Sequence, residues 1–404
     1  MTAARARGPG ASFALLLPLL LAAQPVATDS YLPALPAIAG QLGPASLSLT
    51  VFVLAFGFAQ LLCGPLADRF GRRPVLLSGI ACYAVAALGC ALAGSMGLLA
   101  AGRALQGFAM AAILVCARAA VRDLYPAHEG PHVMARGLTG LGFVALLSPI
   151  VGAFVVQHAG WRWVLAGMAI YAVVLFALCF RWFRETQRPQ SPGLAAAQGS
   201  ARAVFASRTF RAWASLATAT FGGIFCFLLF SPMVYIGYLG FTPSQYGWIP
   251  AAGSLVYIGS TLACRRLLRR FGAVRSVQYG ALLSLAGASV QILGCWLAPA
   301  SAVPLLAGHL CYCLGHGIHQ PCGQAGAVSD LPHQAGRAVS WSGFAMMVVA
   351  FCMGQLAAPF VDASYSHGAW PMTLPILAAA VALGGIAFAW LPRLYPHARK
   401  ETAP

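Results

Sequence analysis

The 404-residue chain is 60% hydrophobic, and only 8% of its residues are charged, far below the roughly 25% of an ordinary soluble domain. So few charges cannot cover a soluble surface, and composition therefore excludes a soluble globular protein. The net charge of +17 could indicate a nucleic-acid partner, but the arginines form short clusters between long apolar stretches and give no continuous basic face. An integral membrane protein, in contact with a lipid bilayer and without nucleic acid, fits this arrangement better.

The first apolar stretch, Phe13 to Ala23, follows Arg5 and Arg7 and so has the pattern of a signal peptide. The apolar segment continues, however, to Ile38, which makes it long enough to cross a bilayer. We therefore expect it to be kept as the first spanning helix.

Further along the chain, charges are separated by long neutral intervals. No charged residue occurs between Arg211 and Arg265, or between Arg275 and Asp330. A spanning helix needs about 20 residues, so each interval fits two helices joined by a short turn. Applied throughout, this argument predicts an all-α membrane protein with twelve transmembrane helices. They are expected at Phe13–Ile38, Leu47–Leu66, Val75–Ala93, Leu98–Ala117, Gly137–Gln157, Trp163–Phe180, Ala212–Tyr238, Tyr246–Cys264, Ser276–Leu297, Val303–Val328, Ala338–Val361 and Trp370–Leu391.

An internal repeat divides this series of helices. Arg69-Phe70-Gly71 after the second helix recurs as Arg270-Phe271-Gly272 after the eighth. The repeat predicts two pseudo-symmetric six-helix bundles, 1–183 and 209–404, joined by a cytoplasmic linker at 184–208. Repeats arranged about a central substrate site are typical of alternating-access transporters.

The basic residues predict the orientation. Of the 25 Lys and Arg residues, all but Arg103 and Arg162 fall on the side of the N-terminus in this assignment. The positive-inside rule makes that side cytoplasmic, and an even helix count places the C-terminus there as well.

The segment GPLADRFGRRP at 64–74 follows the second helix. Gly71 can adopt positive φ at little cost, whereas Asp68 lies near a helix C-terminus, where the dipole disfavours an anion. A plain positive-inside loop would explain the arginines but not this acid. We therefore expect a switchable cytoplasmic gate. The gate motif comprises Gly64, Asp68, Arg69, Gly71, Arg72 and Arg73.

This segment resembles the G-x-L-A-D-R-x-G-R-R pattern of the major facilitator superfamily. Within that superfamily, the stretch Asp29-Ser-Tyr-Leu-Pro-Ala-Leu-Pro36 and the stretch Arg122-Asp123-Leu-Tyr-Pro126 are similar to the Bcr/CflA group of drug/proton antiporters. The resemblance implies proton-driven export of small amphiphilic drugs, such as bicyclomycin- or chloramphenicol-like antibiotics, across the bacterial inner membrane by a single chain. A proton-coupled importer of a small metabolite on the same fold stays open.

Two charged residues inside predicted helices are candidates for proton coupling. Asp29 is the only acid well inside a span, and an intramembrane carboxylate is a functional-site hypothesis by default. A solvated acid near the outer mouth is the alternative. Arg103 lies in Gly102-Arg103-Ala-Leu-Gln106-Gly107, which resembles the superfamily's R-x-x-Q-G motif. Its guanidinium could donate to Asp29 or to carbonyls of the first helix, or it could extend outward to the membrane surface.

The fifth helix carries Ser148-Pro149-Ile-Val-Gly152, similar to the G-P-x-x-G motif of the superfamily's antiporters, with Ser148 in place of Gly. Pro149 removes one backbone hydrogen bond and Gly152 permits close packing. Aromatic walls with few fixed hydrogen bonds tolerate varied apolar ligands, although aromatic side chains also face lipid or the membrane interfaces. The residues expected to line the substrate cavity are Tyr31, Gln106, Phe225 and Phe230.

Three histidines, His309, His316 and His319, lie in the tenth helix. We interpret them as a polar cavity wall or an auxiliary proton relay, because no further residue at ligand spacing completes a metal site. An enzyme is not expected: the only lysine is Lys400, so there is no P-loop, and neither HExxH nor GxSxG with a plausible base is present. No cofactor or metal is predicted.

Overall fold

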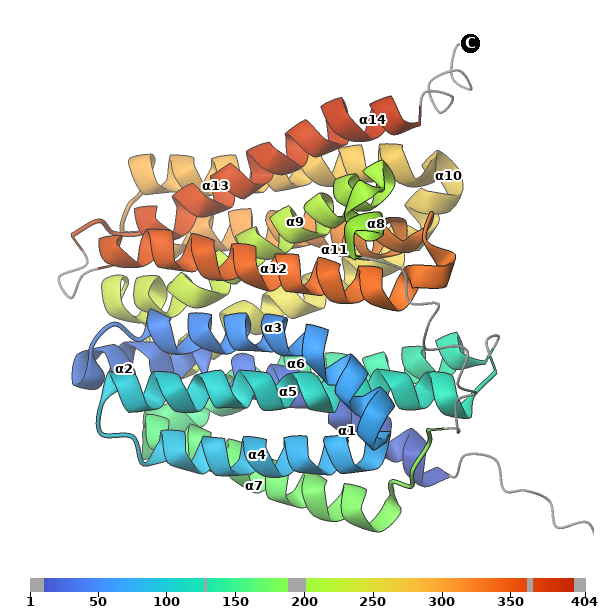
Figure 1. Ribbon diagram of the computed structural model, residues 1–404. Helices are drawn as coiled ribbons and strands as arrows, with labels where there is room; N and C mark the ends of the chain where they lie inside the picture. Colours follow the sequence, from blue (N-terminus) through green and yellow to red (C-terminus); the bar gives the residue numbers. More distant parts are fainter. Residues whose placement is uncertain (1–10, 127–128, 188–200, 362–365, 396–404) are drawn as a thin grey trace, which may run out of the picture.

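The computed structural model describes residues 11–126, 129–187, 201–361 and 366–395, and these are helical with no strand among them (Figure 1). Ten of the described helices are long and apolar enough to cross a membrane. One of the ten, α10 (Pro243–Leu297), bends at Gly272 (φ 72°) and so contains two spans. Helix α11 (Ala302–Val328), which is not among the ten, carries the three histidines and packs along both arms of α10. Within the described chain, the predicted twelve-helix architecture is confirmed.

The first half consists of α1 (Ala11–Thr28), the 3-10 turn η1 (Leu32–Ala34), α2 (Leu35–Leu42), α3 (Ser46–Phe70), α4 (Arg72–Ala91), α5 (Met96–Leu124), α6 (Gly130–Ala159) and α7 (Trp161–Trp182). The second half consists of α8 (Ala201–Ala206), α9 (Arg208–Pro232), the π-helical turn η3 (Met233–Tyr238), α10, α11, η4 (Pro332–Gln334), α12 (Ala335–Ala357), η5 (Ala358–Phe360), α13 (Trp370–Gly385), the π-helical turn η6 (Ile386–Trp390) and α14 (Leu391–Leu394).

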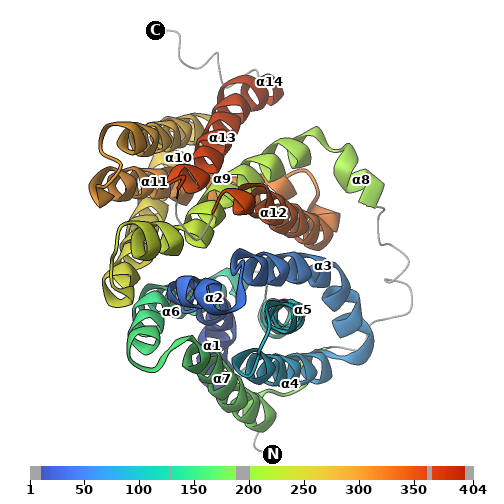
Figure 2. The same ribbon diagram turned by 90° about the vertical axis from the view of Figure 1, so that its left-hand side faces the viewer.

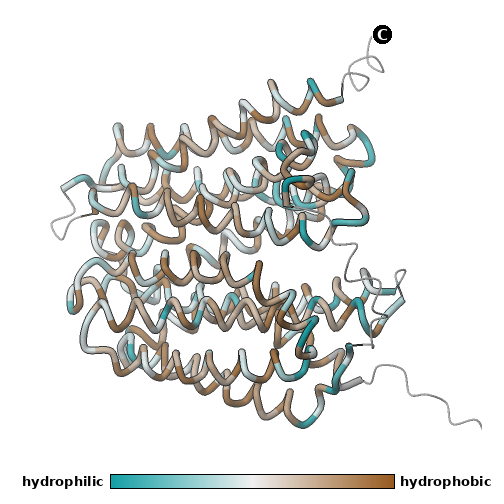
Figure 3. The backbone as a smooth tube through the Cα atoms, viewed as in Figure 1, coloured by the Kyte–Doolittle hydropathy of each residue, from teal (hydrophilic) through white to brown (hydrophobic). Residues whose placement is uncertain are grey.

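The helices gather into two groups, α1–α7 and α9–α14, which face each other (Figure 2). Two pairs of helices join the groups: α3 packs on α12, and α6 packs on α10. Apolar residues run along the helices, while hydrophilic residues concentrate at their ends (Figure 3). We call the end where the described chain begins and finishes the terminal end, and the other the opposite end (Figure 1). Part of the predicted linker, 188–200, lies outside the described residues.

The first span is broken, whereas the sequence predicts a continuous helix over Phe13–Ile38. Helix α1 ends at Thr28, a turn follows, and the span resumes through η1 and α2 to Leu42. Pro33 contributes to the break, because it has no N–H to donate to the Asp29 carbonyl as a continuous helix would require. The Ser30 hydroxyl donates to the Val26 carbonyl at 2.6 Å and replaces part of the lost backbone bonding.

Candidate functional site

Asp29 lies in this break rather than on a helix. Its side chain is half-buried, and Oδ1 accepts a hydrogen bond of 2.7 Å from the hydroxyl of Thr28. It forms no ion pair with any residue of the described chain. A carboxyl group on irregular backbone within the membrane is tolerated where it is buried in protein or faces a cavity. The break therefore presents Asp29 at a point where the chain can change shape locally.

The predicted antiporter motif on α6 packs directly against the Asp29 turn. A Cβ at Gly152 would lie 2.7 Å from Ser30 Cα and closer still to the Ser30 carbonyl oxygen. Only glycine allows this approach. Sequence reasoning predicted close packing by Gly152 but not its partner, because packing across 122 residues leaves no local pattern.

The same stretch of α6 also touches the second half. A Cβ at Gly247, near the start of α10, would lie 3.0 Å from the Pro149 carbonyl oxygen and 2.9 Å from Ala153 Cβ. Next to Gly247, the buried Tyr246 hydroxyl shares a hydrogen bond of 2.9 Å with Ser231 and lies within electrostatic reach of Asp29. The turn, the motif and the second half therefore meet at one place.

Arg103 is fully buried in α5, about two helical turns from its start. Its guanidinium donates to the Ala27 carbonyl at 3.0 Å and to Gln106 Oε1 at 2.9 Å. Its Cζ lies 4.3 Å from the ring centroid of Tyr31 and 4.4 Å from that of Phe52. The predicted contact with the first helix is thus made through a carbonyl and not through Asp29. The alternative, an Arg103 side chain that extends outward to the membrane surface, was wrong, because this side chain has no exposed surface.

We expect Arg103→Lys to lower the free energy of unfolding by about 2 kcal/mol, because an ammonium cannot donate to both acceptors while stacking between two rings. The matched control is Arg162→Lys. Arg162 donates to Gln41 and to the Ala93 carbonyl and stacks on its neighbour Trp161, but it is exposed. The control should change stability by less than about 0.5 kcal/mol. Thermal unfolding in detergent measures both, and equal losses would contradict this account of Arg103.

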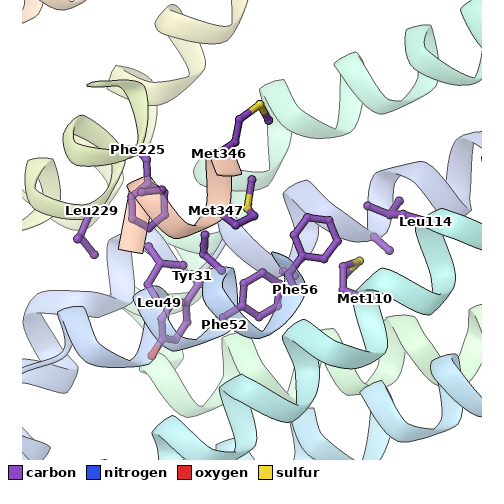
Figure 4. Close-up of a cluster of buried hydrophobic side chains, with 14 of the residues drawn as sticks. Tyr31, Leu49, Phe52, Phe56, Met110, Leu114, Phe225, Leu229, Met346 and Met347 are labelled. Atoms are coloured by element: carbon purple, nitrogen blue, oxygen red, sulfur yellow. The ribbon is translucent and has the colours of Figure 1, made fainter. Parts of the chain in front are cut away.

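Two of the four predicted cavity residues, Tyr31 and Phe225, lie at the contact between the halves. Tyr31 and Phe225 belong to a buried cluster to which both halves contribute (Figure 4), and Gln106 is buried and bonded to Arg103. Phe230 belongs to the same buried core and also lines a small space beside Met233 and Phe360, towards the opposite end. The periodicity of α9 could not assign a face to each of its phenylalanines. Besides Tyr31 and Phe225, the cluster contains Leu49, Phe52, Phe56, Met110, Leu114, Leu229, Met346 and Met347.

The predicted gate motif forms a charge cluster at the terminal end. Asp68 pairs with Arg72 at 2.6 Å, and Arg72 Nε also donates to Asp123 at 3.1 Å. Gly71 has φ 96°, and a Cβ there would lie 2.6 Å from Glu185 Oε2. The remaining motif residues lie at its edge: the Arg69 guanidinium lies over Phe70, the Arg73 guanidinium donates to the Phe180 carbonyl, and Gly64 borders open space.

Glu185 is a residue of this charge cluster that sequence reasoning missed. Its carboxylate follows α7 and caps the N-terminus of α4, accepting the N–H groups of Arg72 and Arg73 at 3.0 Å each. Burial alone would raise the pKa of Glu185, but bonds from the N–H groups of Gln187, Arg73, Arg72 and Thr186 outweigh it and hold that pKa below its usual value. Its position in a loop gave no signal beyond the scarcity of acids in the chain.

Glu185→Gln should lower the free energy of unfolding by about 1 kcal/mol at pH 7, because the amide offers one acceptor oxygen where the carboxylate offers two. Because the pKa of Glu185 is lower in the folded state than its usual value of 4.5, the ionised carboxylate stabilises the fold at pH values above 4.5. This stabilisation is lost as the pH falls through the folded-state pKa. The difference between parent and variant should therefore shrink below about pH 4.5. Thermal unfolding from pH 7 to pH 4 checks this, with the exposed Asp330→Asn as control. A constant difference would contradict it.

The three histidines of α11 are buried. His309 stacks on Phe227 with ring centroids 3.3 Å apart, and His316 Nδ1 shares a hydrogen bond with the Thr220 hydroxyl, so both face α9, as their seven-residue spacing predicts. His319 bonds the Val277 carbonyl on α10 instead. No group of three or more His, Cys, Asp or Glu side chains in the described ranges is arranged to hold a metal ion.

Two helical bundles in contact along one seam, with buried charges and a broken helix at that seam, define the class of secondary transporters. The family model of the Major Facilitator Superfamily matches residues 19–354. The chain belongs to this superfamily, as the resemblance of its motifs predicts.

Among the similar proteins are several with names that refer to drug resistance. The chloramphenicol resistance protein of Pseudomonas aeruginosa is 28% identical, over 89% of this chain and 85% of that protein. The bicyclomycin resistance protein homolog of Haemophilus influenzae is 27% identical, over 86% and 88%. The multidrug resistance protein MdtL of Shewanella oneidensis is 29% identical, over 80% and 82%. These names are consistent with the drug-efflux group that the sequence resembles.

Solved structures share the fold. A D-xylose-proton symporter superposes with a TM-score of 0.76 at 16% identity, covering 94% of this chain and 97% of that one. A bacterial homologue of the human lysosomal transporter Spinster, in an inward-facing and occupied conformation, gives 0.72 at 14% identity, with 96% of each chain covered.

Proposed function

We propose that this protein exports small amphiphilic drugs across the bacterial inner membrane in exchange for protons, by alternating access. The observation that carries the proposal is the position of Asp29, in a break of the first span that contacts both α6 and, through α6, the second half. The names of the relatives support a drug as substrate and export as direction. The shared fold alone does not choose a direction, because a sugar-proton symporter has it too.

In this mechanism Asp29 takes a proton from the outer side and releases it inward. An ionised Asp29 would attract Arg103, whose guanidinium already reaches the carbonyl of Ala27, two residues away. A protonated Asp29 would not. Proton binding therefore changes the forces on the turn, and Gly152 transmits any movement of Ser30 to α6.

The alternating elements are the two bundles, 1–183 and 209–404, with 184–208 as linker and one chain as the working unit. We infer that the terminal end is cytoplasmic, since the arginine clusters lie there. Two hydrogen bonds between the halves support closure at the opposite, outer end. Gln355 Nε2 donates to Thr50 at 2.8 Å, and the Ser244 N–H donates to Gln157 at 3.1 Å.

We further infer that the charge cluster of Asp68, Arg72, Asp123 and Glu185 is the inner gate. Its hydrogen bonds tie α3, α4, α5 and the segment after α7 into one block. A block held in this way can move as a unit against the second half, and breaking Asp68 from Arg72 would free an acid for a new partner.

A growth-inhibition panel in a pump-deficient bacterium tests the function. Cells that express the chain should tolerate higher concentrations of some amphiphilic antibiotics, with chloramphenicol and bicyclomycin first in the panel, and a protonophore at sublethal dose should remove the difference. Sensitivity equal to the vector control for every compound, with the protein present in the membrane, would argue against drug export. Accumulation of a small metabolite instead would favour the importer.

A further inference from the structure

Arg118 lies on α5 between two points at which this helix approaches the second half. One turn earlier, Leu114 belongs to the buried cluster to which both halves contribute (Figure 4). One turn later, Arg122 reaches α12, because a Cβ at Gly336 would lie 3.6 Å from Arg122 Nη1. Residues four apart share one face of a helix, so Arg118 points into the seam between the halves.

The Arg118 side chain is nevertheless exposed, although its neighbours Ala117 and Ala119 are buried. The exposed leucines of the same helix, Leu98 and Leu105, lie near its opposite side. The exposed surface of Arg118 therefore faces water within the seam and not lipid. The seam is open at this level, on the terminal-end side of the buried cluster.

The charge at this opening is positive. Arg118 has no ion pair and no hydrogen bond with any residue of the described ranges. Arg122 is exposed and lies within electrostatic reach of Arg118, so it adds a second positive charge. The acids of the gate motif cannot neutralise them, because Asp68 and Asp123 are already bonded to Arg72. The opening therefore favours an anion and repels a cation.

The second half contributes polar groups that lack partners. Ser342 lies one turn before Met346 on α12 and is buried, and its hydroxyl has no hydrogen-bond partner in the described part of the chain. Gln320 of α11 donates from Nε2 to Met346 Sδ at 3.7 Å, whereas its Oε1 has no partner among the described residues. Buried polar atoms without partners are costly, and a ligand in the opening can bond both.

We propose that the drug enters through this opening from the cytoplasmic end and that Arg118 selects amphiphiles with an anionic group. The anion lies at the Arg118 guanidinium, Ser342 and Gln320 bond the polar part, and the apolar body packs against Leu114 and Met346. Bonds from a guanidinium to an anion are charge-assisted and stronger than neutral ones. The assignment rests on the proposed drug export and narrows its substrates: a neutral drug binds more weakly, and a cationic drug is excluded.

Two dyes with the same rings test the role of Arg118 by binding to the full chain, purified in an uncharged detergent. Anilinonaphthalene sulfonate is anionic, and phenylnaphthylamine lacks the sulfonate. In fluorescence titrations, Arg118→Gln should weaken binding of the sulfonate dye by roughly tenfold and that of the neutral dye by less than about twofold. Arg118→Lys should keep most of the sulfonate binding, because the charge is retained. The matched control is Arg181→Gln, at an exposed position of α7, which packs within the first half. It should bind both dyes as the parent does.

Arg118→Glu should reverse the preference, so that the cation ethidium binds more tightly than it does to the parent. Thermal unfolding should show these variants as stable as the parent, because Arg118 has no partner to lose. Unchanged sulfonate binding in Arg118→Gln, an equal loss for the neutral dye, or an equal loss in Arg181→Gln would overturn the proposal.

A competition experiment distinguishes an amphiphile from a small inorganic anion. Millimolar sulfate should displace the sulfonate dye no more than sodium chloride of the same ionic strength does. Stronger displacement by sulfate would show a site for inorganic anions and overturn the assignment to amphiphiles. None of these titrations requires transport, so the role of Arg118 can fail while the growth-inhibition panel still supports drug export.

Discussion

Asp29→Asn is expected to reduce antibiotic resistance to the level of the vector control. Asparagine has nearly the shape of aspartic acid and can still accept the hydrogen bond from Thr28, but it cannot release a proton. The coupled cycle should stop although the fold is kept. Minimal inhibitory concentrations, read together with the amount of protein in the membrane, measure the effect.

The control for this prediction is Asp330→Asn, which removes an exposed acid at the terminal end and should leave resistance unchanged. Thermal unfolding in detergent should show Asp29→Asn at least as stable as the parent, because a neutral side chain is easier to bury than a carboxylate. Resistance in Asp29→Asn equal to that of the parent would mean that this carboxyl does not carry the proton.

Gly152→Ala should abolish transport and lower the free energy of unfolding by about 1 to 3 kcal/mol, the usual range for an overpacked core. The added Cβ would collide with backbone atoms of Ser30, which cannot rotate away as a side chain can. Helix α6 or the Asp29 turn must therefore move. Transport assays and thermal unfolding together measure the loss.

Gly167→Ala on α7 is the matched control for this change, because a Cβ there would meet no atom of the described residues within 4 Å. It should leave transport intact and stability unchanged or slightly higher, since alanine favours helix over glycine. If Gly152→Ala behaved like Gly167→Ala, the contact between α6 and the Asp29 turn would have no part in the transport cycle.

Much of the fold could be predicted because membrane proteins obey simple constraints on length and charge. The neutral interval from Arg275 to Asp330 predicted two helices. The second of them was expected at Val303–Val328 and is found at Ala302–Val328. Helix ends at the charged surface were predicted less accurately: the fourth helix was expected at Leu98–Ala117 but continues through Arg118 and Arg122 to Leu124. Hydrophobicity fixes the part inside the membrane, whereas a helix can continue into water without an apolar signal.

The site was harder to predict because its contacts join distant parts of the chain. Pro33 could have indicated the break at Asp29, but it stands in an otherwise apolar run that predicts one continuous span. Arg103 could be placed in a helix, yet its acceptor at Ala27 depends on how α1 packs on α5. Glu185 caps a helix whose N-terminus lies more than a hundred residues away in the sequence. Such contacts follow from packing and leave no periodicity in the sequence.

Transport into inverted membrane vesicles tests proton-coupled export most directly. In these vesicles the proposed cytoplasmic end faces the medium, and the lumen corresponds to the outer side of the membrane. An acid lumen therefore supplies the protons that are exchanged for drug. Labelled drug should accumulate in the lumen of vesicles with parent protein, stop accumulating when the gradient is collapsed, and not accumulate with Asp29→Asn. Accumulation that persists without the gradient or with Asp29→Asn, or drug that leaves the lumen together with protons, would contradict the account.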